Sequence, residues 1–503
     1  MSASSAGPAG RAVPRPHPHL VEIPTWAWLE QLGAKLGRMV RLADVPDAEW
    51  DALARLGFDI VWLMGVWRRS FQARLAALAY TENFPRYDRA LPGWTAEDVI
   101  ASPYAVADYS PDPRIGSWEE LDAVREKLRA RGMALFLDFV GNHTALDHPW
   151  THEHPEFFVQ GSPDDFSAAP SNFYPIDSSA GMRFLAFGRD PYFPPWRDVA
   201  QLNHFEPRMR SALLEQLRSI ARHCDGVRCD MAMLQLGDIF GKIWSGLLRG
   251  ASPPGREFWE EAHAAVPDLI LLAEAYWGTE QRLLDLGFSW VYDKGLYDAV
   301  RDFRIPEIHT RIAAGVSYQS RLARLMENHD EEPCAAVFGA ERIPAAAALF
   351  GTLPGMRFYY QREIEGCSVY LPITLRHEAP GGCDAARAAL FEKILRITSE
   401  DVFHQGAWSI LRVTPEGDPT SGNLAAWQWR GEKAWKVLAV NLAREASQGR
   451  VQFEGTPLPA RQYVFYDQLN DVRYLRAADE LRGAGLFVRR EALGAHLFDV
   501  TPA

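Results

Sequence analysis

Short apolar runs alternate with longer amphipathic runs through most of this 503-residue chain, and this alternation limits the fold more than any other feature. Such alternation is typical of repeated β-α units around a parallel sheet. The strand-like runs number eight: LVEIPTW near residue 20, then 58–64, 133–140, 226–230, 269–277, 288–293, 323–330 and 356–361. Eight strands with intervening helices predict a closed (β/α)8 barrel of the TIM type.

The clearest β-α unit lies at residues 117–140. Ser117 and Glu120 stand at the spacing of a helix-capping box, and Gly132 ends the amphipathic pattern before a buried strand. A second unit begins at Pro207, a residue type favoured in the first turn of a helix, and leads into the strand-like GVRCD at 226–230. Both units run in the order that a parallel barrel requires.

The chain is longer than a barrel of ~250 residues needs, so we expect additional regions. Residues 1–19 are small, polar and Pro-rich, which predicts a disordered tail. The barrel is assigned to 20–402, with an inserted B domain at 144–200 after the third strand and another excursion at 68–103. From 403 to 503 short strands and turns alternate, which predicts an antiparallel β-sandwich domain.

Charge and composition exclude several partners. The net charge is −12 and no dense basic run occurs, which argues against nucleic acid. Neither a signal-peptide pattern nor ~18 consecutive apolar residues is present, so we expect neither export nor membrane insertion. The five cysteines form no CxxC pair; we expect reduced thiols and a cytoplasmic location. The oligomeric state is left open.

Carboxylates stand at the ends of four predicted strands: Asp138, Asp230, Glu274 and Asp330. In a TIM barrel the active site lies at the carboxyl ends of the strands. Taken alone, each acid could be a buried hydrogen-bond acceptor, half of a structural ion pair or a helix cap. Their arrival at one barrel mouth favours a shared chemical role.

Glycoside hydrolysis uses such a set of acids, because a retaining enzyme needs a carboxylate nucleophile and a carboxylic acid that protonates the leaving oxygen. Arg228 lies two residues before Asp230, on the same face of the strand, and its charge favours an ionised Asp230. Glu274 follows the apolar LILLA, whose surroundings would raise its pKa and keep it protonated.

Four ordered segments resemble the alpha-amylase family, glycoside hydrolase family 13. They are DFVGNH at 138–143, GVRCD at 226–230, AEAYW at 273–277 and ENHD at 327–330. AQLN at 200–203 is similar to the family's motif at the end of its B domain, and 103–117 and 354–366 resemble further family segments. The resemblance covers most of residues 20–402 and implies a catalytic barrel, an inserted B domain and a β-sandwich C domain.

Site roles follow from this resemblance. It implies that Asp230 is the nucleophile, that Glu274 is the acid/base, and that Asp330 binds hydroxyls of the sugar in subsite −1. Arg228 would support the nucleophile. The remaining substrate-binding residues that it implies are Tyr104, which would stack on the sugar, His143 and His329.

Two departures from the family pattern concern the leaving-group side and calcium. Met233 and Leu234 stand where many starch-degrading members have Lys and His, which predicts a less polar leaving-group side. The same change weakens the family's calcium site, although Asn142 is retained. The acids of the 144–200 segment, Asp164, Asp165 and Asp190, lack the dense oxygen spacing of a calcium loop. We therefore expect no cofactor, with calcium as the alternative.

The segment DHPWTHEHPEFF at 147–158 is the one cluster that suggests zinc. It brings His148, His152 and His154 close in sequence, but Pro149 disfavours a continuous helix and no HExxH pattern occurs. A loop that lines the sugar cleft is the preferred interpretation. Trp150 and Trp196 are read first as core residues and second as sugar platforms.

These observations predict a retaining enzyme that acts on α-glucosidic bonds of oligosaccharides or α-glucans. The alternatives within enzymes are a transglycosylase, a phosphorylase and an isomerase resembling trehalose synthase, which share the catalytic residues and differ in the acceptor. A non-catalytic carbohydrate-binding member is the alternative from another class; such relatives typically lose one of the three acids. Pattern alone leaves open whether 403–503 binds glycogen or is a structural cap.

Overall fold

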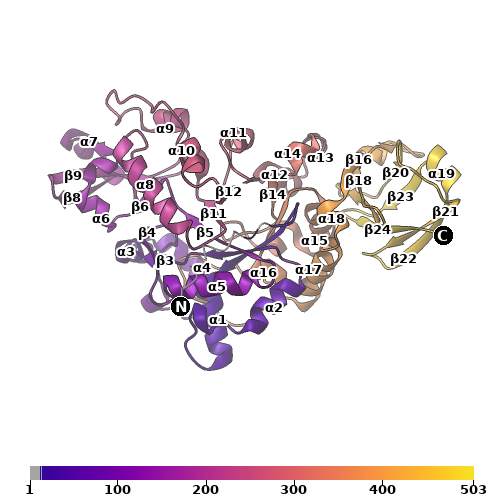
Figure 1. Cartoon of the computed structure of the whole chain (residues 1–503), viewed down its shortest axis with the longest axis horizontal. Helices are drawn as coiled ribbons and strands as arrows, with labels where there is room; N and C mark the ends of the chain where they lie inside the picture. Colours follow the sequence, from indigo (N-terminus) through magenta and orange to yellow (C-terminus); the bar gives the residue numbers. More distant parts are fainter. Residues whose placement is uncertain (1–11, 13) are drawn as a thin grey trace, which may run out of the picture.

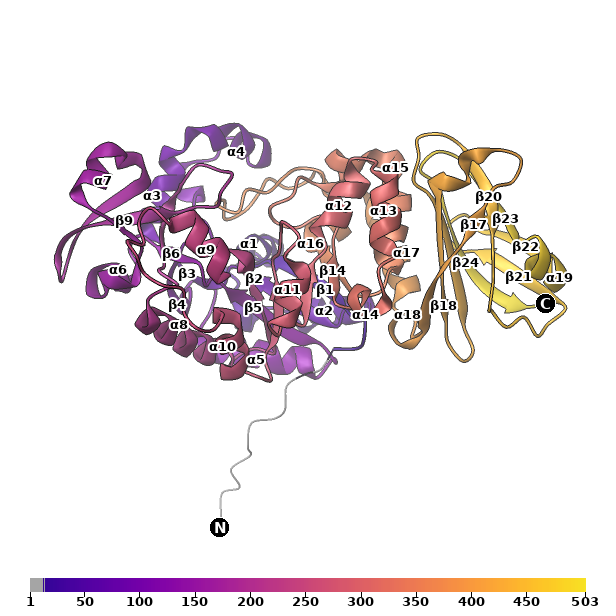
Figure 2. The ribbon, with the colours of Figure 1, turned by 90° about the horizontal axis from the view of Figure 1, so that it is seen from above.

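The computed structural model describes residues 12 and 14–503, so most of the tail predicted at 1–19 lies outside the described residues. The molecule is elongated. Figure 2 shows the barrel in the centre, with the segment that carries α6, α7 and β9 at one end and the C-terminal strands in yellow at the other. Figure 1 shows the same order from a perpendicular direction.

Eight parallel strands close the barrel in the order β1-β15-β14-β13-β12-β11-β5-β2. The fold class predicted from the sequence is confirmed, and every strand overlaps one of the eight expected runs, although β14 ends at Arg324 and leaves Asp330 in the loop beyond it. Their bounds are β1 His19–Pro24, β2 Ile60–Met64, β5 Ala134–Phe139, β11 Gly226–Cys229, β12 Ile270–Ala273, β13 Trp290–Tyr292, β14 Leu322–Arg324 and β15 Met356–Tyr360.

Helices cover the outside of the barrel. Pro207 lies in the first turn of α8, as expected. Ser117 caps α5 by accepting the Glu120 N–H, but the reciprocal bond of a capping box is absent, because the Glu120 carboxylate accepts the Ala43 N–H and pairs with Arg41. The helices are α1 Thr25–Leu36, α2 Asp47–Arg55, α5 Trp118–Arg129, α8 Pro207–Ile220, α9 Gly237–Trp244, α10 Phe258–Ala265, α11 Glu280–Asp285, α12 Lys294–Arg301, α13 Ile305–Ile312, α14 Val316–Gln319, α15 Cys334–Thr352, α16 Gln361–Ile364, α17 Ala385–Thr398 and α18 Val402–Gln405.

Helix α15 is, among the described residues, the one helix long and apolar enough to cross a membrane, and 61% of its apolar window is buried in the protein. It packs against α17 and against strand β19 of the C-terminal domain. These two contacts account for its apolar composition.

Two insertions rise from the barrel. Between β2 and α5 lie β3 Trp67–Arg69, α3 Phe71–Ala79, α4 Phe84–Ala90 and β4 Val106–Pro111. After β5 comes an antiparallel sheet in the order β6-β10-β9-β7, with β8 paired to β9. Its elements are β6 His143–Ala145, α6 Pro149–Glu153, β7 Gln160–Gly161, α7 Pro163–Ala168, β8 Phe173–Ser178, β9 Gly181–Gly188 and β10 Trp196–Gln201.

The C-terminal part is a sandwich of a six-stranded sheet, β16-β18-β19-β24-β21-β22, and a three-stranded sheet, β17-β20-β23. Trp427 and Trp429 of β18 join it to the barrel, because their indole nitrogens donate to the hydroxyl and the carbonyl of Thr352. The elements are β16 Ala407–Leu411, β17 Val413–Thr414, β18 Leu424–Arg430, β19 Trp435–Asn441, β20 Ser447–Val451, β21 Gln462–Asp467, β22 Val472–Ala477, α19 Ala478–Gly483, β23 Leu486–Arg490 and β24 Ala495–Pro502.

One expectation about the cysteines is wrong. Cys367 and Cys383 form a disulfide that closes the loop between α16 and α17. The sequence offered no CxxC spacing, and the two cysteines meet only because this loop folds back on itself. Cys224, Cys229 and Cys334 are buried outside this disulfide. The cytoplasmic location is a separate expectation and stays a prediction.

Candidate active site

Arg228 is the centre of a charged group at the carboxyl ends of the barrel strands. Its side chain is 0% exposed. One guanidinium nitrogen, Nη1, donates to Asp230 Oδ1 at 2.5 Å. The other, Nη2, lies 2.8 Å from Glu274 Oε2, as an ion pair without hydrogen-bond geometry. One buried cation therefore contacts both carboxylates that the sequence analysis named as nucleophile and acid/base.

Aromatic rings enclose this guanidinium. It lies 5.0 Å from the ring centre of Tyr104, 5.4 Å from that of Trp62 and 5.8 Å from that of Tyr292. Cation–π attraction is strongest where water is excluded, so the rings stabilise the charge and hold its plane in place. Sequence reasoning found Tyr104 through the family motif but missed Trp62 and Tyr292, which carry no local signal.

Three groups contact the Glu274 carboxylate: Arg228, the Met231 N–H and the Tyr276 hydroxyl. The Met231 N–H donates to its Oε2 at 2.6 Å, and the Tyr276 hydroxyl donates to its Oε1 at 2.7 Å. Met231 has a φ of 44°, a left-handed conformation that is costly for a non-glycine residue. Met231 directly follows Asp230, where the chain leaves β11. Burial raises the pKa of Glu274, and Arg228 acts against this rise.

Asp230 is nearly as buried, with 7% of its side chain exposed. Burial raises its pKa, while Arg228 acts in the opposite direction. The guanidinium therefore has the direction of effect that the sequence analysis expected, but burial outweighs it. His143 Nε2 lies 4.0 Å from Asp230 Oδ2. Burial lowers the pKa of His143 to about 4, so this imidazole is neutral at pH 7.

Asp330 differs from the other two acids, because 44% of its side chain is exposed. Its Oδ2 lies 3.0 Å from His329 Nε2. Desolvation in the barrel mouth raises the pKa of Asp330, but the ion pair with His329 outweighs it and the pKa is lowered. The ring of Tyr104 stacks on the His329 imidazole at 5.0 Å with an interplanar angle of 25°.

Asp138, the fourth strand-end acid, has a structural environment. The Trp62 indole donates to its Oδ1 at 3.1 Å, and the Gly65 N–H donates to its Oδ2 at 2.7 Å. Burial raises its pKa to about 6. These bonds fix the loop after β2. Asp138 is therefore a buried hydrogen-bond acceptor, the structural alternative considered for each of these acids.

The residues after the nucleophile do not line the mouth as expected. Met233 and Leu234 are 0% and 1% exposed and belong to the main hydrophobic core. They lie in a single turn at Ala232–Gln235, whose inward face packs into the barrel wall. The expectation that these two side chains make the leaving-group side less polar is therefore wrong. Met231 is the partly exposed residue of this segment.

The position associated with calcium is occupied by an amide pair. Gln201 Nε2 donates to the Asn142 carbonyl at 2.8 Å and to Asn142 Oδ1 at 3.1 Å. A calcium ion needs ~6–8 oxygen ligands, whereas here N–H donors already use the Asn142 oxygens. Asp190 accepts two backbone N–H groups of its own loop instead. These residues do not fit a calcium ion.

The 147–158 segment contains a short helix, α6, that begins at Pro149. His148 Nδ1 accepts the Trp150 N–H, and His154 lies 3.3 Å from Glu156 at the surface. These contacts favour the interpretation of 147–158 as a loop over a zinc site. Trp150 and Trp196 are partly buried and pack against the main core, in line with their first reading.

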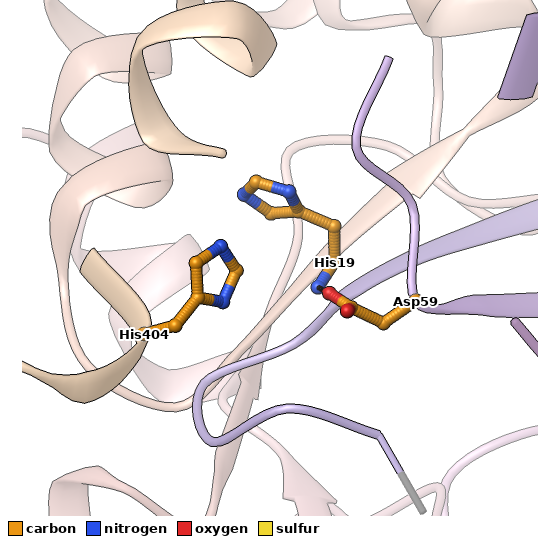
Figure 3. A group of neighbouring side chains, drawn as sticks. All are labelled: His19, Asp59 and His404. Carbon is orange, nitrogen blue, oxygen red and sulfur yellow. Dashed lines mark hydrogen bonds between the residues drawn. The ribbon is translucent and has the colours of Figure 1, made fainter. Parts of the chain in front are cut away.

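Across the described residues, His, Cys, Asp and Glu side chains come close enough to share a metal ion at one place: His19, Asp59 and His404 (Figure 3). This group lies at the opposite, amino-terminal end of the barrel. His19 contacts the Gly57 carbonyl with Nδ1 and the Thr398 hydroxyl with Nε2, and Asp59 pairs with Arg15 at 2.6 Å. With these partners the group fits a hydrogen-bonded network better than a metal site. We call this amino-terminal end of the barrel the floor and the carboxyl-terminal end the mouth.

Comparison with known proteins shows a family likeness over part of the chain. Residues 49–280 match the model of the alpha-amylase catalytic domain. The chain is 27% identical over 322 residues to alpha-amylase MalA of Haloarcula japonica, which covers 62% of this chain and 39% of that protein. It is 30% identical over 159 residues to alpha-1,4-glucan:maltose-1-phosphate maltosyltransferase 2 of Streptomyces coelicolor, which covers 31% of this chain and 21% of that protein.

The chain thus spans less than half the length of these two relatives. Among solved structures, the maltogenic alpha-amylase AmyB from Thermotoga neapolitana superposes with a TM-score of 0.67 at 16% identity, covering 97% of this chain and 99% of that one. This likeness concerns the fold. Taken together, the comparisons show that residues 49–280 are similar to the alpha-amylase catalytic domain and that the chain shares the fold of this solved structure.

Proposed function

We propose that this chain is a retaining enzyme that cleaves α-glucosidic bonds of oligosaccharides or α-glucans by double displacement. Asp230 attacks the anomeric carbon, Glu274 protonates the departing glycosidic oxygen, and Asp330 binds hydroxyls of the sugar under attack. The observation that carries the proposal is the contact of one buried guanidinium, Arg228, with both Asp230 and Glu274.

The charges suit the first half of the reaction. A general acid must hold its proton near the working pH, and burial raises the pKa of Glu274 in that direction. When Glu274 gives this proton to the leaving oxygen, it becomes an anion next to Arg228. The guanidinium therefore stabilises the deprotonated Glu274 that must next act as a base.

The second half of the reaction uses the same groups. The deprotonated Glu274 removes a proton from water, and the resulting hydroxide displaces Asp230 from the anomeric carbon. The Met231 N–H and the Tyr276 hydroxyl keep the Glu274 carboxylate in one orientation for both steps. No cofactor takes part in this scheme.

Transfer to a sugar acceptor is the second candidate, and exposed aromatic side chains favour it. Trp277, three residues beyond Glu274, is 41% exposed, and its ring meets that of Tyr192 edge to face at 5.3 Å. Tyr192 and Phe193 are 70% and 68% exposed. Flat exposed rings suit stacking on a sugar, so an acceptor held here could replace water as the second nucleophile.

The test is product analysis with maltooligosaccharides, sucrose and trehalose, with and without phosphate. Hydrolysis predicts shorter sugars with retained anomeric configuration, whereas transfer predicts longer or isomeric ones. Asp230→Asn and Glu274→Gln are each expected to lower turnover by roughly 10³-fold or more without a change in melting temperature. Near-normal turnover in either variant would exclude the assigned roles, and an inactive wild type would favour the non-catalytic alternative.

A further inference from the structure

A buried carboxylate on the first barrel strand contacts His329 of the candidate active site. Glu22 lies in β1 and is 0% exposed. Its Oε1 lies 2.5 Å from His329 Nδ1, although the two residues are 307 positions apart in the sequence. Its other oxygen, Oε2, has no hydrogen-bond partner. A charged group in such a place is costly unless its partner is also charged.

His329 lies between two carboxylates. Its Nδ1 faces Glu22 and, at 3.4 Å, the Tyr104 hydroxyl, while its Nε2 lies 3.0 Å from Asp330 Oδ2. The Nδ1 contact with Glu22 has hydrogen-bond geometry, whereas Nε2 and Asp330 form an ion pair without it. Two carboxylates therefore flank one imidazole, and opposite charges this close favour its imidazolium form.

The surrounding charges agree with that form. Burial lowers the pKa of His329, but Asp330 and Glu22 outweigh it and leave the pKa well above its ordinary value. Asp138 and Asp230 are further acids that interact with this histidine. Arg228 is the opposing cation, and the Tyr104 ring contacts both the guanidinium and the imidazole. The ring of Trp62 meets the His329 imidazole edge to face, with 5.8 Å between the ring centres.

We propose that Glu22 is a positioning residue that acts through His329: it keeps the imidazole charged and oriented, so that Asp330 stays ionised toward the sugar hydroxyls. The inference rests on the proposed function, since it assigns Glu22 to the same site. Glu22 touches neither substrate nor reacting atoms in this scheme. Its effect should therefore appear in sugar binding and in the protonation of His329.

The experiment compares Glu22→Gln with a matched control, Glu363→Gln. Glu363 is another buried acid, 1% exposed, that accepts the Tyr360 N–H at the end of β15. Side-chain 15N spectra, with signals assigned by their loss in His329→Asn, report the protonation of His329. In Glu22→Gln we expect the imidazolium signals to disappear at a lower pH than in the wild type. Glu363→Gln should leave them unchanged.

Steady-state kinetics complete the test. Glu22→Gln is expected to lower kcat/KM about tenfold or more at pH 8, and to cause no further loss when His329→Asn is already present. Unchanged His329 signals, or an equal loss in the His329→Asn background, would overturn the inference. The spectra are read independently of turnover, so the result for Glu22 stands apart from the failure or success of Asp230→Asn and Glu274→Gln.

Discussion

The pKa values of buried histidines are shifted in opposite directions at the two ends of the barrel. At the carboxyl end, His329 lies between Glu22 and Asp330, and its pKa is well above its ordinary value. At the amino end, burial and the neighbouring Arg357 together lower the pKa of His404 to about 3. His19 lies beside the same arginine, and its pKa is also lowered by burial.

The difference teaches that neighbours, and not depth alone, decide the charge of a buried imidazole. Acids at the mouth create a charged site that can act on a polar ligand. Arginines at the floor leave neutral imidazoles that serve as hydrogen-bonding links between β1 and the segments that precede the C-terminal domain. In barrels of this type the mouth carries the chemistry and the floor carries stability.

The largest expected effect is that of Asp59→Ala, which should lower stability without lowering turnover. Asp59→Ala removes the partner of Arg15 and an acceptor for the His19 N–H. We expect the free energy of unfolding to fall by about 2 kcal/mol, because the buried His19 N–H is left without its acceptor and the partly exposed Arg15 loses its partner. Turnover per folded molecule should stay unchanged. Urea denaturation and active-site-normalised kinetics measure the two quantities.

Asp230→Asn should show the reverse, with turnover lost and stability kept. If Asp59→Ala lowered turnover as strongly as stability, the division between floor and mouth would be wrong. Since the same preparation supplies both measurements, loss of folded protein cannot be mistaken for loss of chemistry.

A smaller effect concerns pH. His404 stays neutral in the folded protein down to a pKa of about 3, whereas the unfolded chain takes up a proton near 6.5. The unfolded state therefore binds more protons in this window, and stability should fall as the pH drops from 6.5 toward 4, by up to about 1.4 kcal/mol per pH unit for each such histidine.

His404→Gln should make this slope shallower, as measured by urea unfolding at pH 5 and pH 7. His329 has the opposite sign: its contribution is fully present below 6.5 and is lost as the pH rises through its raised folded pKa. An unchanged slope in His404→Gln would mean that the floor histidines are not neutral.

The smallest expected effect is that of chelation. Both ends hold a group that resembles a cation site, Asn142 with Gln201 at the mouth and His19 with Asp59 at the floor, and in both the ligand atoms are used by hydrogen bonds. Exhaustive EDTA treatment should leave the melting temperature and turnover unchanged. A fall of several degrees that added calcium reverses would assign a metal to one of them.

The sequence predicts the mouth better than the floor. Asp230, Glu274 and Asp330 stand at strand ends in ordered motifs, so their convergence follows from the barrel alone. Glu22 interrupts an apolar strand, which is a signal, but nothing local points to His329. His404 lies outside the barrel strands altogether, and its approach to His19 depends on how α18 crosses the floor.

Elements and contacts that depend on distant packing were also missed. The edge strands β16 and β22 bury few side chains on either face, so their sequences carry little hydrophobic alternation. The disulfide between Cys367 and Cys383 depends on a loop that folds back, which spacing does not reveal. Met233 and Leu234 are buried within the turn at Ala232–Gln235, which the sequence pattern does not reveal.

The closure of the barrel has a consequence for protein synthesis. Strand β1 pairs with β2 on one side and with β15 on the other, and the register of the second pairing joins His19 to Arg357. During translation at ~5–20 residues per second, β1 therefore waits roughly 20–70 s for its second neighbour. An unpaired strand edge is prone to wrong pairing during such a wait. Synonymous codons that slow elongation between residues 60 and 356 should lower the yield of soluble protein more than the same codons placed after residue 404.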